Sequence, residues 1–307
     1  MGSTSLAFVY GAIGRWFTYV SVVTIVGTAS VTVGIRRAWR GSTDSNVEQT
    51  ERRLLRTAVA AALVLLGATS WRLYAQAYSA FGIEESVTWD DVGIVAFHTA
   101  WGHGWWWQAV AAALAGVVLT SAMKVAHLKV AHLREILVTT AAVAVVVAAP
   151  LTGHAVAREG TVWLSVALQM LHVAGVGLWI GTLLIIMTLI RPSGDAVLAA
   201  AVRAFSPIAL AAVSTIVLSG LFTAFIYLDS LSDLWSGAYG RTLILKLVLF
   251  AAVAALGAYN WRRLKPVLEQ EGRVRTLNRT ARVELLVAGL TLAVTAVLVA
   301  LPLVHDS

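Results

Sequence analysis

Long hydrophobic runs recur along the whole chain and alternate with short polar segments. Eight of the runs are long enough for a transmembrane helix, which needs about 20 mostly apolar residues. Strands of a membrane barrel are only about 10 residues long and alternate in polarity, so that architecture is disfavoured. The pattern predicts an all-α, polytopic membrane helical bundle with eight transmembrane helices, at residues 12–35, 54–80, 104–124, 133–153, 161–190, 200–228, 241–261 and 283–303.

The charged residues indicate how the predicted helices are oriented. Most of the 23 Lys and Arg residues fall in four alternate connections, and the other connections contain Glu84, Glu85, Asp90, Asp91, Asp229 and Asp233. Because basic loops stay on the cytoplasmic side, both termini are expected outside. The spans then form an N-terminal four-helix half, residues 1–150, and a C-terminal four-helix half, residues 151–307. Trp105, Trp106 and Trp107 are expected in the aromatic belt at the outer surface.

Composition narrows the range of functions. Hydrophobic residues make up 59% of the chain and charged residues 13%, whereas a soluble domain is about 45–50% apolar and about 25% charged. The net charge of +7 comes mostly from basic residues in the loops predicted to be cytoplasmic. The expected partner is therefore the lipid bilayer, and no nucleic-acid partner is expected. There is no cysteine, and the sequence contains no nucleotide-binding, nucleophile-elbow or zinc-protease motif. Enzyme activity is therefore not expected.

The fifth predicted span contains an unusual polar stripe. At 100° per residue, Ser165, Gln169, His172, Trp179 and Met187 fall within about 60° of one another. His172 lies near the middle of the bilayer, where an ionisable side chain is costly and is a functional candidate by default. Two interpretations stay open, namely a hydrogen-bonded packing residue and a metal ligand or proton relay.

Other polar candidates lie closer to the outer surface. His98 and His103 precede the third span and His154 ends the fourth. Imidazole binds copper, zinc and iron, although these side chains are equally compatible with wet surface loops. Arg72 and Lys246 lie inside spans, where each either extends its charged end to the outer surface, fixes a carboxylate or balances the charge of a vestibule.

A set of ordered motifs in the second half resembles the copper resistance CopD family. The motifs are Gly153-His154-Ala155, Leu171-His172, Trp179-x-Gly181, Arg203-x-Phe205-Ser206, Ser219-Gly220-Leu221, Tyr239-Gly240-Arg241-x-Leu243-x-x-Lys246, Asn260, Pro266, Arg282-x-Glu284-Leu285 and Pro302. The resemblance covers residues 150–303, and the first half is similar in span count and around Thr99-x-x-Gly102.

This resemblance implies a multi-pass protein of the bacterial inner (cytoplasmic) membrane that transports or imports copper ions and contributes to copper resistance. By position it implies His154 and His172 as the leading copper-handling candidates. In the leading hypothesis, His98, His103 and His154 receive the ion at the outer side, His172 passes it on, and Met187 lies further inward. Other polar side chains along the path would be Gln169, Arg72, Tyr239, Arg241 and Lys246. A periplasmic CopC-like copper-binding protein is the implied partner, and a homo-oligomer is considered.

Two alternatives remain open at this point. One is a redox protein that binds b-type haem through two histidines, which requires both at a similar depth on facing helices. The other is a copper-delivery or assembly partner that does not transport. Soft Cu(I) prefers thiolate and thioether ligands, and the chain has no cysteine and four methionines. The oxidation state of the metal is therefore left open.

Overall fold

The computed structural model describes residues 3–35, 45–82, 86–126, 130–153, 162–227, 231–235, 237–264 and 273–301. Regular structure in these ranges is helical throughout. The elements are α1 (Ser3–Ser30), η1 (Val31–Ile35), α2 (Ser45–Phe81), α3 (Trp89–His98), α4 (Ala100–Ala126), α5 (Ala131–Ala148), η3 (Ala149–Thr152), α6 (Val162–Val176), η5 (Gly177–Gly181), α7 (Thr182–Ile185), η6 (Ile186–Ile190), η7 (Arg191–Ser193), α8 (Asp195–Tyr227), η8 (Leu231–Leu234), α9 (Gly237–Tyr259), η9 (Asn260–Leu264) and α10 (Arg273–Leu298).

Eight helical segments are long and apolar enough to cross a membrane, which confirms the predicted all-α polytopic bundle. They are Leu6–Ile35, Gln49–Phe81, Ala100–Val125, Ala131–Thr152, Val162–Ile190, Asp195–Ile226, Gly237–Arg263 and Arg279–Leu298. Most predicted limits agree within a few residues. The first and last spans begin earlier than predicted, because helices continue past the apolar core of a membrane, and the last ends earlier, at Leu298. Hydropathy alone does not define helix ends.

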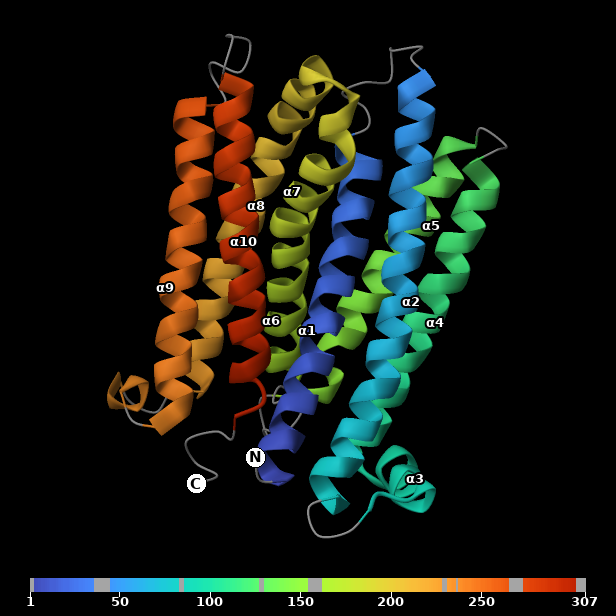
Figure 1. Ribbon diagram of the computed structural model, residues 1–307, viewed down its shortest axis with the longest axis vertical. Coiled ribbons are helices and arrows are strands. Elements are labelled where there is room, and N and C mark those ends of the chain that lie inside the picture. The colour runs from blue at the N-terminus through green and yellow to red at the C-terminus, as the bar shows by residue number, and fades with distance from the viewer. Residues whose placement is uncertain are drawn as a thin grey trace.

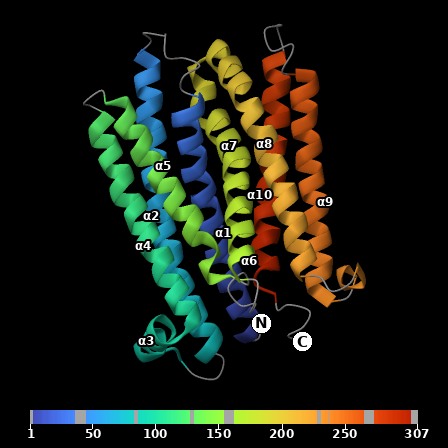
Figure 2. The same ribbon diagram turned by 180° about the vertical axis from the view of Figure 1, so that it is seen from behind.

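The helices form two groups around a central pair (Figure 1). Helices α2, α4 and α5 lie on one side, and α8, α9 and α10 lie on the other, as the reverse view in Figure 2 also shows. Between them, α1 lies against the continuous helix of α6, η5 and α7 and also contacts α2, α5 and α10. Helix α1 begins and α10 ends at the same end of the bundle, which we call the outer end in line with the positive-inside prediction. The division into halves at residue 150 stays a prediction.

Helix α1 is the most enclosed span, with 78% of its most apolar window buried. Four threonines lie along it, and each donates its hydroxyl to the backbone carbonyl four residues earlier; they are Thr18, Thr24, Thr28 and Thr32. Such bonds satisfy the hydroxyl within its own helix. A central helix can therefore carry many hydroxyl groups without needing partners on its neighbours.

Backbones touch where α1 crosses the fifth span. A Cβ atom added at Gly27 would overlap the backbone of Gly181, and one added at Gly181 would overlap the Val23 carbonyl. At Gly177 an added Cβ would lie 2.6 Å from Cβ of Val26. Small residues allow this close approach between membrane helices, where lipid gives no hydrophobic drive for association. The crossing coincides with the π-helical turn η5, which widens the helix at this point.

The short helix α3 at the outer end was not predicted. Thr88 and Asp91 form a reciprocal N-terminal cap: the Thr88 backbone N–H and hydroxyl both donate to Asp91 Oδ2 at 2.8 Å, and Thr88 Oγ1 accepts from the Asp91 N–H. These hydrogen bonds, led by the one from the Thr88 backbone N–H, lower the pKa of Asp91. The capping spacing is readable in the sequence, but it lies in a connection that hydropathy treats as a loop.

The three consecutive tryptophans do not share one environment. Trp105 is buried, and its indole N–H donates to the Thr69 carbonyl at 2.8 Å, so its assignment to the aromatic belt was wrong. Trp106 and Trp107 are exposed, as a belt position requires. Three successive residues point in different directions around a helix, so one of them faces the protein.

We predict that Gly181→Leu will strongly destabilise the bundle, because its side chain must displace the α1 backbone. Overpacking typically costs about 1–3 kcal/mol, and a clash with backbone belongs at the upper end or beyond. Thermal unfolding in detergent, followed by circular dichroism, measures the effect. Gly67→Leu is the matched control, because nothing lies within 4 Å of a Cβ there. Equal stability of the two variants would contradict the crossing.

Candidate functional site

The predicted metal ligands are spread over the bundle. His98 ends α3 and His103 lies in the first turn of α4, and both are exposed at the outer end. His172 is half-buried in α6, and Met187 is buried in η6, about four turns or 20 Å further along. His154 lies outside the described residues. Within the part of the chain that the structure describes, no group of three or more His, Cys, Asp or Glu could hold a metal ion.

His172 contacts the neighbouring helix α8 through one ring nitrogen. Its Nδ1 lies 3.2 Å from Ser219 Oγ, and the Ser219 hydroxyl lies 2.7 Å from the Thr215 carbonyl, to which it donates. In the tautomer with the ring proton on Nδ1, Ser219 Oγ accepts from Nδ1–H, and Nε2 holds the lone pair that can bind a metal or a proton.

Lys246 of α9 lies close enough to act electrostatically on His172. Both residues are about 15 Å from the outer ends of their helices at 1.5 Å per residue, so they share one level of the bundle. Two positive charges repel strongly where water is excluded. A cation held by His172 would therefore be destabilised whenever Lys246 is protonated.

The polar stripe of the fifth span begins in α6. Ser165 is buried with no hydrogen-bond partner for its hydroxyl, Gln169 is half-buried one turn further along, and His172 lies on the next turn. Trp179 and Met187 lie in the π-helical turns η5 and η6, which have more residues per turn than a uniform 100° spacing assumes. Their place on the same stripe stays a prediction.

The remaining path candidates lie at the outer start of α9. Tyr239 is half-buried, and Arg241 is exposed. The Arg241 Nε–H donates to the Gly237 carbonyl at 3.0 Å, four residues earlier in the same helix. This Arg241 contact is local to α9.

A buried carboxylate lies deeper in the C-terminal half and was not among the predicted site residues. Glu284 of α10 is 3% exposed, and its Oε2 accepts from Asn260 Nδ2 at 2.8 Å. Thr280 Oγ1 donates to Asn260 Oδ1 at 2.6 Å. The Trp179 ring lies close to the carboxyl group, since a Cβ at Gly257 would be 3.2 Å from Glu284 Oε1 and 3.3 Å from Trp179 Cζ2. Among the described residues, no Lys or Arg lies within ion-pair distance of this carboxylate. The sequence signal that could have identified Glu284 is an isolated Glu in an apolar run, since intramembrane ionisable residues are rare.

One interpretation of the sequence placed the charged end of Arg72 at the outer surface, and the structure does not show this. It is buried, and its Nη1 and Nη2 donate to Gln108 Oε1 at 2.7 Å and to Thr152 Oγ1 at 2.6 Å. Gln108 Nε2 in turn donates to the Ala148 carbonyl at 3.0 Å. This network ties α2 to α4 and to η3. The neighbouring helices supply acceptors that a sequence pattern does not reveal, which is why the side chain can stay inside.

Comparison with known proteins identifies the family. Residues 6–164 match the model of the copper resistance protein D-like N-terminal domain, and residues 199–298 match that of copper resistance protein D. The chain belongs to the copper resistance protein D (CopD) family. A relative found by sequence search, the copper transport protein CutJ of Bacillus subtilis (strain 168), is 33% identical over 156 residues. That match covers 49% of this chain and only 28% of the relative, and no solved structure matches the chain.

We predict that Glu284→Ala will destabilise this CopD-family protein by about 1–3 kcal/mol, because it leaves the Asn260 amide without its acceptor in a buried site. Glu284→Gln keeps an oxygen that can accept from Asn260, so its loss should stay below about 1 kcal/mol. Thermal unfolding of the detergent-solubilised protein distinguishes the two. Equal losses in both variants would show that the charge, rather than the acceptor, stabilises the fold.

Proposed function

We propose that this protein transports copper ions across the bacterial cytoplasmic membrane and thereby contributes to copper homeostasis. Membership of the CopD family supports this function, and so does the name of the Bacillus subtilis relative. Eight membrane-spanning segments provide the enclosure that a transport path requires. Finer statements about the path rest on the polar groups inside the bundle.

The proposed path runs along α6 in the C-terminal half. From the outer end, Ser165, Gln169 and His172 lie on successive turns, and in the tautomer with Nδ1–H the Nε2 lone pair of His172 would be available to an ion. About two turns or 10 Å further inward, Trp179 of the same helix lies close to Glu284. The single observation that carries the proposal is this succession, at two depths, of one imidazole and one carboxylate without a described cation partner.

A level of the path that offers few protein ligands suits the passage of an ion better than its storage. Conduction needs sites that hold an ion strongly enough for it to enter and weakly enough for it to leave. Imidazole nitrogen and carboxylate oxygen both bind copper, and the buried thioether of Met187 lies toward the inner end. The positive charge of Lys246 beside His172 further limits how long an ion stays there.

Delivery of copper at the outer end completes the proposal. His98 and His103 are exposed there, at the junction of α3 and α4. Exposed imidazoles can accept a metal ion from another protein by ligand exchange. A soluble copper-binding protein of the CopC type in the periplasm is the proposed donor.

We predict that His172→Ala will reduce copper flux into proteoliposomes at least about 10-fold, the usual range for loss of a ligand or its supporting contact. His132→Ala is the matched control, because His132 is an exposed histidine at the inner end of α5. Lys246→Gln should increase flux or copper affinity, since it removes a positive charge next to the ion. Protein amount and thermal stability of each variant are measured alongside.

Three outcomes would contradict this proposal. Unchanged flux in His172→Ala would remove that residue from the path. Copper binding without flux in the wild-type protein would favour a delivery or assembly role. A Soret absorption band in the purified protein, lost in His172→Ala, would favour the haem-binding alternative.

A further inference from the structure

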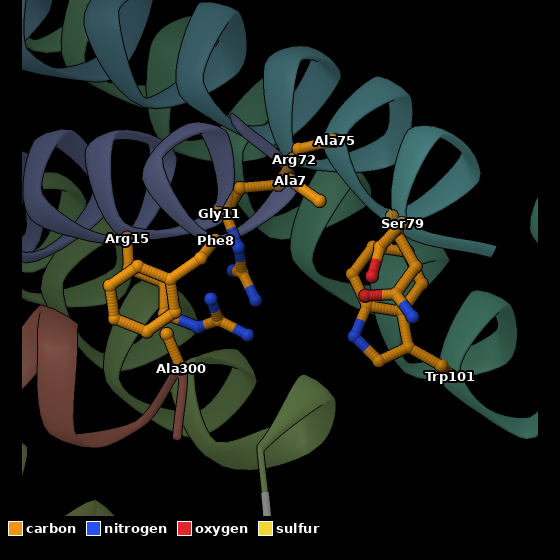
Figure 3. A pocket seen from close by; sticks show the side chains of 10 residues that line it. Ala7, Phe8, Gly11, Arg15, Arg72, Ala75, Ser79, Trp101 and Ala300 are labelled. Carbon is orange, nitrogen blue, oxygen red and sulfur yellow. The ribbon is translucent and has the colours of Figure 1, made fainter. Parts of the chain in front are cut away.

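A second polar site lies at the outer end of the N-terminal half, away from the proposed copper path. It is a cavity of about 220 Å³ bounded by α1, α2, the start of α4 and Ala300. A site for a single water needs only about 10–15 Å³ of such free volume, so this cavity can hold a larger group. Figure 3 shows the guanidinium groups of Arg15 and Arg72 pointing into it from α1 and α2, with Trp101 on the far side.

The backbone makes room for both arginines. A Cβ at Gly11 would lie 2.8 Å from Arg15 Nη1, so the guanidinium folds back over the preceding turn of α1. A Cβ at Gly14 would lie 2.6 Å from Arg72 Cγ. The two glycines, one turn apart, therefore allow two long cationic side chains to enter the same small space.

The two positive charges are not neutralised within the described residues. Arg72 donates two of its N–H groups to Gln108 and Thr152, which are uncharged. Arg15 Nε is buried and has no hydrogen-bond partner. The guanidinium of Arg72 also lies 5.9 Å from the centre of the Trp101 ring, but an aromatic face does not cancel a full charge. Two buried positive charges without a counter-ion are costly, so an anion bound in this cavity would lower their electrostatic free energy.

We propose that this cavity binds the phosphate group of an anion. Guanidinium groups recognise phosphate through paired, charge-assisted hydrogen bonds, and Arg15 still has unused donors. Gln76 and Ser79 line the cavity and offer further donors, and Ser79 is exposed, so the site opens toward the outer end. Phe8 and Ala75 provide apolar walls. The phosphate belongs either to an anionic lipid headgroup of the outer leaflet or to free phosphate in solution.

The test uses the full-length protein in detergent with two probes, inorganic phosphate and phosphatidylglycerol. Thermal shift gives the affinity for each probe, and native mass spectrometry counts bound lipid. Arg15→Gln is the main variant, because Arg15 makes no side-chain hydrogen bond within the described residues that the fold would lose. Arg241→Gln is the control, because it removes the same charge from an exposed position at the same end.

We expect at least one probe to bind, with affinity about 10-fold weaker in Arg15→Gln and unchanged in Arg241→Gln, as loss of a charge-assisted hydrogen bond implies. A response to phosphatidylglycerol alone identifies a lipid site, and a response to phosphate alone identifies a soluble ligand. Binding of neither probe, or equal weakening in both variants, would overturn the proposal. Because no copper enters this assay, its result is independent of the proposed transport function.

Discussion

The direct backbone contact between α1 and the fifth span is the constraint on which the rest of the bundle depends. In lipid, helices gain little from burying apolar surface against one another, so close packing must supply the association. Gly27 and Gly181 let the two axes approach until their backbones touch. That contact fixes the rotation of the α6–η5–α7 helix, and thereby directs His172 toward α8 and Trp179 toward α10. The site in the C-terminal half is therefore positioned by a helix from the N-terminal half.

The central pair separates two polar interiors. On one side, Arg15 and Arg72 share a cavity at the outer end, with no carboxylate paired to them among the described residues. On the other, Glu284 is buried beside Asn260 with no described cation in contact, and Lys246 lies at the level of His172. The first region favours an anion, and in the second an ionised Glu284 would favour a cation that Lys246 opposes nearer the outer end. The proposed anion site and the proposed copper path are both consistent with this difference.

Hydropathy was enough to predict the fold class and the eight spans, because an unbroken apolar run of this length has few other solutions. The local departures needed three-dimensional information. Helix α3 is too short and polar to register as a span, and the π-helical turns depend on the packing of η5 and η6. For the site, spacing on α6 grouped Ser165, Gln169 and His172, but it could not show that the partner of His172 is Ser219. It also could not show which acceptors surround Arg72, since these come from α4 and η3.

In the proposed path, the contacts around His172 give a reason why a single imidazole would be enough. In the tautomer with the ring proton on Nδ1, Ser219 fixes the ring, and Nε2 would be the coordinating atom. A protonated Lys246 at the same level would oppose a bound cation and keep occupancy at this depth low. An ionised Glu284, about two turns further in, would favour a cation there. The proposed path would then have a repelling charge beside the first ligand and an attracting charge beyond it, and neither level offers enough ligands among the described residues to retain the ion.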